Sequence, residues 1–289
     1  MANILITAPT PIAALAVSRG TGAANLLSPD PREIWLDGAV GSAATIDIDL
    51  GVERIIDTVF LGCLFSAADA ASWTISGGLT GYADRVIKPA GALRVPERDW
   101  KRRVMSHALW FGAEQLVRYL RLSITQPEGA TPLAIGALIV GEGFQPRWNK
   151  EWGSGRGVRD TGTVTRLPSG GVAVVEGARY ATFAWTLGDL SEAEAETLYD
   201  MQLDRGESRC VLVVENPART AGLRNRIRYG ALTGLRAFER RNAAQTSWQM
   251  SMEDWAIEPD PLFVPQSIPA LTLGGEPLTL GGQIITLGD

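Results

Sequence analysis

Alternating apolar and polar residues predict strands in the first half of the chain. In residues 45–50, Ile46, Ile48 and Leu50 share one face, while one threonine and two aspartates share the other. This period of two residues is the pattern of a strand with one buried side. Further apolar runs follow at 56–61, 73–75, 117–125 and 135–140. Short strands separated by glycine-containing turns are typical of a β-sandwich or jelly roll.

The second half shows the same pattern after a stretch that lacks it. Residues 148–160 are rich in Gly, Arg and Trp and are expected to form a linker or long loop. In 180–187, Phe183, Trp185 and Leu187 alternate with smaller or more polar residues, which predicts a strand. The other strands predicted here are 162–167, 171–175, 209–215, 227–235 and 246–255. A Pro-Ser-Gly turn joins the first two of these into a hairpin.

One helix is predicted, at 192–204. Ser191 and Glu194 form a capping box, in which each side chain satisfies a backbone donor at the start of the helix. Gly206 is a natural residue to end it, because glycine readily adopts the backbone conformation found just after a helix. No other long helix is expected.

The last 32 residues, 258–289, change character. Four prolines between 259 and 269 exclude a regular helix. A Leu-Thr-Leu-Gly-Gly motif then repeats with a period of seven, and its glycine pairs exclude a coiled coil. We expect an extended arm that adds strands to a sheet edge of another subunit. The expected interface residues are Leu271, Leu273, Leu278, Leu280, Ile285 and Leu287.

Composition is consistent with two globular domains and this arm. A length of 289 residues corresponds to about two domains, and 45% apolar residues are enough for two cores. We therefore expect an all-β fold with domains at 1–145 and 146–257, followed by the arm at 258–289. The net charge of −5 does not indicate a sequence-specific nucleic-acid-binding protein. Since no apolar run reaches roughly 18 residues, no membrane insertion is expected.

Candidate catalytic and metal-binding residues are few. His107 is the only histidine and lies in no recognisable motif, so the base of a catalytic triad is not expected. The two cysteines lie far apart in apolar runs, which predicts buried free thiols rather than a zinc site. Asp47, Asp49 and Asp57 have oxygen ligands suited to Ca²⁺, but strand alternation places them on a solvent face. We expect no enzyme activity, no metal and no cofactor.

The order of several motifs in the first region resembles that of a discoidin-type (galactose-binding-like) domain. The resemblance covers about residues 20–142. Its elements are 23–27 (Ala-Ala-Asn-Leu-Leu) followed by Trp35, then 46–51 with 56–59, then the closing pair 117–122 and 135–140. It implies an N-terminal jelly roll. The disulfide usual in secreted members is absent, which favours a relative assembled inside the cell.

The second region is similar in layout to the tail-tube-like domain of bacteriophage distal tail proteins. The matching parts are the strand bearing Trp185, the helix capped by Ser191, the strand 211–214 and the closing strand to Trp255. The resemblance implies a tail-tube-like β-sandwich with one helix, within a structural protein of the virion tail assembled in the host cytoplasm. It also implies a homo-oligomeric ring of sixfold or threefold symmetry that contacts tube, hub and tape-measure proteins.

The alternative function is a carbohydrate-binding or host-adhesion module, because discoidin-type folds commonly bind sugars or lipids through loops at one end. Trp100 and Trp110 are then expected to stack on sugar rings, and Arg98 and Arg102 to pair with acidic groups. Against this, aromatic residues in such loops more often belong to a core or an interface. Both functions are compatible if the domain decorates a tail tip and binds a host surface glycan.

Overall fold

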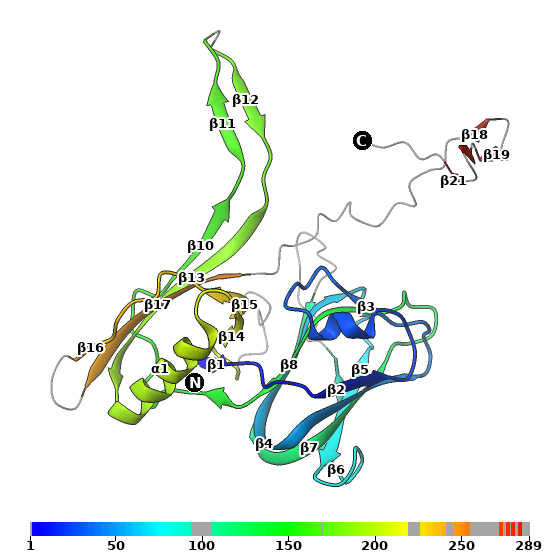
Figure 1. Ribbon diagram of the computed structural model, residues 1–289, viewed down its shortest axis with the longest axis horizontal. Coiled ribbons are helices and arrows are strands. Elements are labelled where there is room, and N and C mark those ends of the chain that lie inside the picture. The colour runs from blue at the N-terminus through cyan, green and yellow to red at the C-terminus, as the bar shows by residue number, and fades with distance from the viewer. Residues whose placement is uncertain are drawn as a thin grey trace. The chain divides into compact units, whose positions relative to one another are not determined.

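The computed structural model describes residues 2–93, 106–168, 170–218, 226–240 and 245–254, together with the backbone of four short strands between 272 and 284. The chain divides into two units, 1–257 and 258–289. Antiparallel strands and one α-helix make up the larger unit, which confirms the expected all-β fold (Figure 1). Within these described ranges, no helix is long and apolar enough to cross a membrane.

The first sheet contains seven strands in the order β3-β8-β4-β7-β5-β6, with β2 paired to β4. A 3-10 helix at Ala23–Leu27 lies between β2 and β3 in the chain. The strand bounds are β2 Ala14–Val17, β3 Trp35–Leu36, β4 Ala43–Phe65, β5 Ser72–Gly78, β6 Arg85–Ala92, β7 Ser106–Thr125 and β8 Ala134–Gly141.

Two long bent strands, β4 and β7, fold this sheet into two layers. The predicted runs 45–50 and 56–61 are two halves of β4, joined by an irregularity between Asp49 and Arg54. Gly51 turns the chain there with a φ of 78°, and its N–H donates to Asp49 Oδ1 at 2.7 Å. The first half pairs with β2 and the end of β7, and the second half pairs with β8 and the start of β7.

The jelly-roll core lies between these two layers. Ile46, Ile48 and Leu50 are buried, as their alternation predicts. They pack with Leu120 and Leu122 of β7 and with the buried indoles of two tryptophans, Trp35 and Trp73. The period of two residues therefore predicts the buried face of β4 and of β7 correctly.

The second sheet contains eight strands in the order β10-β13-β17-β15-β14-β1-β9, with β16 paired to β17. The strand bounds are β1 Leu5–Thr7, β9 Gly143–Phe144, β10 Gly155–Asp160, β13 Arg179–Leu190, β14 Cys210–Val214, β15 Ile227–Leu232, β16 Glu239–Arg240 and β17 Thr246–Asp254. Two features depart from the sequence expectation. The N-terminal β1 pairs with β14, so a division at residue 145 separates β1 and β9 from the sheet they extend.

The other departure concerns the stretch expected to be a loop. Residues 155–160 of that stretch form β10, the edge strand paired with β13. Every residue of β10 is exposed, so this strand lacks the buried apolar face whose alternation predicts a strand.

Helix α1, Glu192–Arg205, covers one face of the second sheet. Its capping box forms as predicted, with Ser191 accepting from the Glu194 N–H and the Glu194 side chain accepting from the Ser191 N–H. Ala195 and Leu198 are its buried residues. They pack against Trp185 of β13 and Trp248 of β17 in a core of their own. The helix ends at Gly206, as expected.

The other face of this sheet packs against the jelly roll. Leu5, Leu212 and Val214 of the second sheet share a buried cluster with Phe60 of β4 and Ile139 of β8. Strand β14 is consequently buried on both sides, because its alternate residues Val211 and Val213 face the helix-covered core. The two lobes of the larger unit are therefore joined by a hydrophobic core.

A hairpin extends from the second sheet beyond β10 and β13 (Figure 1). Its outer part is the two-stranded sheet of β11, Thr163–Arg166, and β12, Val172–Val175, which confirms the predicted hairpin. Gly162 and Gly177 lie opposite each other at its base, where a side chain on Gly177 would meet the Gly162 nitrogen at 2.1 Å. We call residues 161–178 the projecting hairpin.

The smaller unit, 258–289, is described only as short strands. Its backbone forms two antiparallel pairs of two-residue strands: β18 Thr272–Leu273 with β19 Glu276–Pro277, and β20 Thr279–Leu280 with β21 Gln283–Ile284. The rest of the predicted arm lies outside the described residues.

The Ser191 cap is expected to contribute measurably to stability. Ser191→Ala removes the acceptor for the Glu194 N–H and should lower the free energy of unfolding by about 1 kcal/mol. Ser191→Asn supplies an equally good cap and should stay within a few tenths of a kcal/mol of the native chain. Urea unfolding followed by circular dichroism measures both, and equal losses for the two variants would contradict the role of the cap.

Candidate functional site

The structure describes only one of the four predicted carbohydrate-binding residues. Trp110 lies on β7, half-buried, and packs against the jelly-roll core. Arg98, Trp100 and Arg102 lie outside the described residues. Among the predicted interface leucines and isoleucines, only the backbone of Leu273 and Leu280 is described; Leu271, Leu278, Ile285 and Leu287 lie outside. These predictions stay open.

His107 has a structural contact. It lies on β7, where its Nδ1 accepts the Cys63 N–H at 3.1 Å and its ring lies 5.4 Å from that of Phe60. This bond supports a residue with an unusual backbone, because Cys63 has a φ of 52°. Both cysteines are buried and free, as predicted. Among the described residues, no three His, Cys, Asp or Glu side chains gather as metal ligands.

Asp57 is not on a solvent face, contrary to expectation: it is 7% exposed. The irregularity between Ile56 and Thr58 turns it inward. Its Oδ1 accepts from the Gly143 N–H and the Thr58 hydroxyl, both at 2.7 Å. It therefore ties β9 of the second sheet to β4 of the jelly roll. Burial raises the pKa of this carboxyl, against the opposing effect of the two hydrogen bonds.

The raised pKa of Asp57 predicts a pH dependence of stability. Because the folded-state pKa lies above the unfolded value of about 3.9, the folded state favours the protonated acid. Its relative stabilisation is therefore present at low pH and is lost as pH rises through the folded pKa. Asp57→Asn keeps an acceptor without the charge, so it should equal the native chain in acid and exceed it at neutral pH.

Asp57→Ala is the contrasting variant. It leaves the Gly143 N–H without its acceptor and should cost about 1–3 kcal/mol at every pH. Urea unfolding across the pH range measures all three proteins. A native chain that gains stability over Asp57→Asn on going from acid to neutral pH would overturn the sign of the shift.

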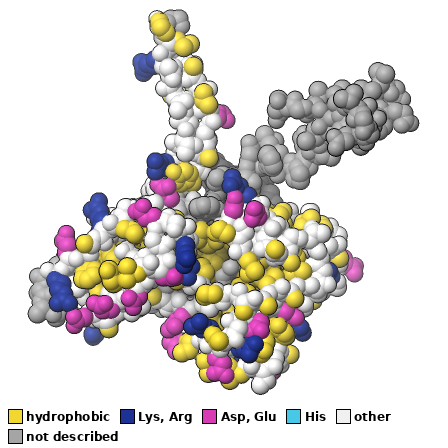
Figure 2. Space-filling model, viewed as in Figure 1, with side chains coloured by type: hydrophobic (Ala, Val, Ile, Leu, Met, Phe, Trp, Pro, Cys, Tyr) yellow, Lys and Arg dark blue, Asp and Glu magenta, His cyan; other side chains and the backbone are white. Residues whose placement is uncertain are grey.

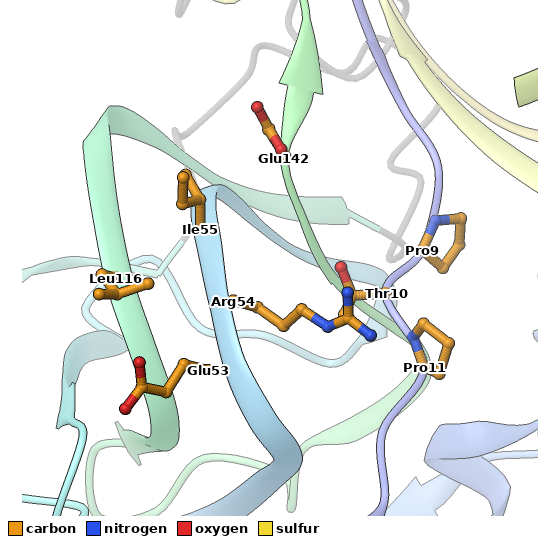
Figure 3. A pocket seen from close by; sticks show the side chains of 8 residues that line it. All are labelled: Pro9, Thr10, Pro11, Glu53, Arg54, Ile55, Leu116 and Glu142. Atoms are coloured by element: carbon orange, nitrogen blue, oxygen red, sulfur yellow. The ribbon is translucent and has the colours of Figure 1, made fainter. Parts of the chain in front are cut away.

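A pocket of about 500 Å³ lies beside the bend of β4 (Figure 3). Its apolar walls include Ile55 of β4 and Leu116 of β7, which are 44% and 45% exposed. Figure 3 shows the Arg54 side chain reaching across it toward Thr10. The lining residues are Pro9, Thr10, Pro11, Glu53, Arg54, Ile55, Leu116 and Glu142. We call it the Arg54 pocket.

The charged groups of the Arg54 pocket are unpaired within the described part of the chain. Glu53, Arg54 and Glu142 form no ion pair or hydrogen bond there through their side chains. Two carboxylates against one guanidinium give the pocket a net negative charge. An apolar surface with unpaired charges at its rim suits a partner that brings both apolar and basic groups.

A second cluster lies on the outer face of the jelly roll. Tyr82, from the β5–β6 loop, and Tyr119, on β7, have ring centroids 5.2 Å apart in an edge-to-face arrangement. Arg121 binds Asp47 through two hydrogen bonds of 2.6 Å, and its guanidinium lies over the Tyr82 ring.

Arg118 completes this cluster. It binds Asp49 at 3.0 and 3.2 Å and lies over the Tyr119 ring. Its hydrogen bonds lower the pKa of Asp49, so both carboxyl groups of the cluster already have basic partners. The two phenol hydroxyls make no hydrogen bond with another described residue. We call these six residues, Asp47, Asp49, Tyr82, Arg118, Tyr119 and Arg121, the tyrosine face.

The projecting hairpin exposes apolar side chains along its length (Figure 2). Val164 of β11 is 69% exposed and Val174 of β12, directly opposite, is 62% exposed. Arg156 anchors the sheet end of β10 through two hydrogen bonds to Glu215, at 2.6 and 2.9 Å. The alternation of residues predicts the hairpin, but the exposure of its side chains depends on tertiary packing, which that alternation does not reveal.

Two exposed tryptophans, Trp148 and Trp152, precede this hairpin in the chain. Trp152 is fully exposed, and the Arg147 guanidinium lies 5.6 Å from the centroid of the Trp148 ring. Exposed tryptophans are common at protein interfaces. The only sequence signal for them was the Trp content of a stretch expected to be a loop.

No known protein family matches the sequence, and a search of curated proteins finds no match. Solved structures do show similarity. The chain is similar to the CBM32 module of AlyQ in complex with 4,5-unsaturated mannuronic acid, with 18% identity, coverage of 46% of this chain and 97% of that one, and a TM-score of 0.34.

Two further solved structures are carbohydrate-related modules. CBM32-3 from a family 31 glycoside hydrolase of Clostridium perfringens has 12% identity, coverage of 47% of this chain and 94% of that one, and a TM-score of 0.36. Chitosan-binding module 1 of a chitosanase/glucanase from Paenibacillus sp. IK-5 has 13% identity, coverage of 47% and 98%, and a TM-score of 0.32.

Proposed function

We propose that this chain is a non-catalytic structural subunit that associates with further copies of itself through the projecting hairpin. The observation that carries the proposal is the exposure of that hairpin. An isolated two-stranded hairpin is at best marginally stable in water, and this one also carries exposed valines on both strands. Exposed apolar patches of this kind mark sites of protein association.

Ion pairs fix the base of the hairpin to the second sheet. Three ion pairs surround the sheet-bound part: Arg156 with Glu215, Arg159 with Glu253, and Arg179 with Asp160. In the pair of Arg156 with Glu215 the carboxylate is buried, which partly shields this ion pair from solvent. A fixed base lowers the entropy that the hairpin loses when its outer part is ordered against a partner.

The finer form of the proposal is a subunit of the tail tip of a long-tailed bacteriophage. Its support is the order of parts along the chain: a jelly roll, a sheet covered by one capped helix, and an apolar C-terminal segment, which resembles the layout of distal tail proteins. In this form the association closes as a ring in the virion, with tube, hub and tape-measure proteins as neighbours and the segment 258–289 contributing to the contacts between subunits.

Self-association is expected to depend on the hairpin valines. Val164→Thr with Val174→Thr keeps residues that favour strands but removes buried apolar surface from the interface. A loss of about 1.4 kcal/mol in total weakens association about tenfold. Sedimentation velocity of the whole chain over a concentration series measures it.

The matched control is Val86→Thr, which alters a valine of β6 that is 63% exposed and lies in the other lobe. It should associate like the native chain. A native chain that remains monomeric throughout the series would falsify the proposal, and so would a hairpin variant that associates as strongly as the control.

Glycan binding by the jelly roll is a second candidate function, favoured by the tyrosine face. Its two aromatic rings and arginine N–H groups lie together on one side of a sheet, with two phenol hydroxyls that bond to no other described residue. Aromatic surface combined with a few fixed polar groups is the usual composition of a small-ligand site. Because the carboxylates are paired with the arginines, the surface is close to neutral and suits a neutral saccharide.

A glycan array followed by calorimetric titration tests this candidate. Tyr119→Ala should lower the affinity for any saccharide found by at least tenfold, since it removes one ring and one hydroxyl. Tyr199→Ala, which alters an exposed tyrosine on α1 in the other lobe, should leave it unchanged. Retention of full affinity by Tyr119→Ala excludes this face as the site.

A further inference from the structure

The projecting hairpin has one face that is more apolar than the other. In its register Val164 lies opposite Val174, and Arg166 lies opposite Val172. Directly opposite residues, and residues two apart along a strand, share a face of the sheet. These four side chains therefore form one surface, which we call the valine face.

The valine face carries a single charge. Arg166 is the only charged residue between Thr163 and Val175 in the sequence. Its side chain is exposed and makes no ion pair with the described residues. The face thus combines three valines with one unpaired guanidinium, and the surface it fits must be apolar and acidic.

The Arg54 pocket is apolar and, with two carboxylates against the one guanidinium of Arg54, acidic on balance. Ile55 and Leu116 supply exposed apolar walls, while Glu53 and Glu142 supply carboxylates without a partner among the described residues. Both the pocket and the valine face remain exposed within a single chain, so neither is covered by the other in the same copy.

We propose that the valine face of one copy docks in the Arg54 pocket of a second copy, with Arg166 at the acidic rim to which Glu53 and Glu142 contribute. This inference rests on the proposed self-association and names the surface that receives the hairpin. The segment 258–289 is a poorer occupant, because it contains four acidic residues and no basic one. An acidic segment is repelled by a pocket that already carries a net negative charge.

Cysteine pairing between two different copies tests the contact directly. A chain with Val164→Cys and a differently sized chain with Leu116→Cys are mixed and oxidised; both native cysteines are buried. We expect a disulfide-linked heterodimer. The matched pair of Val164→Cys with Val86→Cys should give at most a tenth as much, since Val86 lies outside the pocket.

Charge reversal tests the role assigned to Arg166. Arg166→Glu alone and Glu53→Arg with Glu142→Arg alone should each weaken self-association about tenfold or more. Mixing the two variant chains should restore association between them, because the reversed charges again complement each other. Sedimentation velocity with one chain labelled measures the mixed complex.

The outcomes separate this inference from the proposed function. Hairpin-dependent association without the heterodimer and without charge rescue overturns the pocket as the receiving surface but leaves self-association in place. A chain that stays monomeric overturns both. Association that Leu116→Asp weakens while the hairpin variants do not, and that removal of residues 258–289 abolishes, assigns the pocket to that segment and also overturns the inference.

Discussion

Burial of β14 on both of its sides is the constraint on which the larger unit depends. Successive side chains of a strand point to opposite faces, so the run Cys210–Val214 is stable only if both faces of its sheet are covered. Helix α1 covers Val211 and Val213, and the jelly roll covers Leu212 and Val214. Each fully buried aliphatic side chain contributes roughly 1.5–3 kcal/mol relative to exposure. The two lobes consequently stabilise each other through one strand.

The same constraint explains why the N-terminus belongs to the second sheet. Strand β1 lies between β14 and β9. Ile6, together with Ile4 just before the strand, lies in the helix-covered core, and Leu5 lies in the core shared with the jelly roll. It thereby extends the doubly covered region by one strand. Asp57 reinforces the junction from the polar side, since its carboxylate holds the Gly143 N–H at the start of β9. A buried polar side chain suits this position because the backbone donor needs an acceptor.

The features that depend on residues close together in the sequence were predicted correctly. The alternation of 45–50 and 180–187 identified buried strand faces, and Ser191 with Glu194 identified the start of α1 to the residue. The pairing of β1 with β14 joins opposite parts of the chain, and nothing near residue 5 encodes its partner. Strand β10 escaped detection because it is an edge strand with no buried side. The tyrosine face was missed for a similar reason, since the strand register brings Asp47 opposite Arg121.

The geometry of the proposed contact determines what kind of assembly it can build. The valine face and the Arg54 pocket are different surfaces of one chain, so a contact between them is heterologous rather than twofold symmetric. Each added copy then presents a free hairpin at one end and a free pocket at the other. Repeating one rotation either closes a ring or continues as an open filament. Because hairpin and pocket lie on the two lobes joined by the β14 core, the packing of that core sets the rotation per copy, and with it whether the assembly closes.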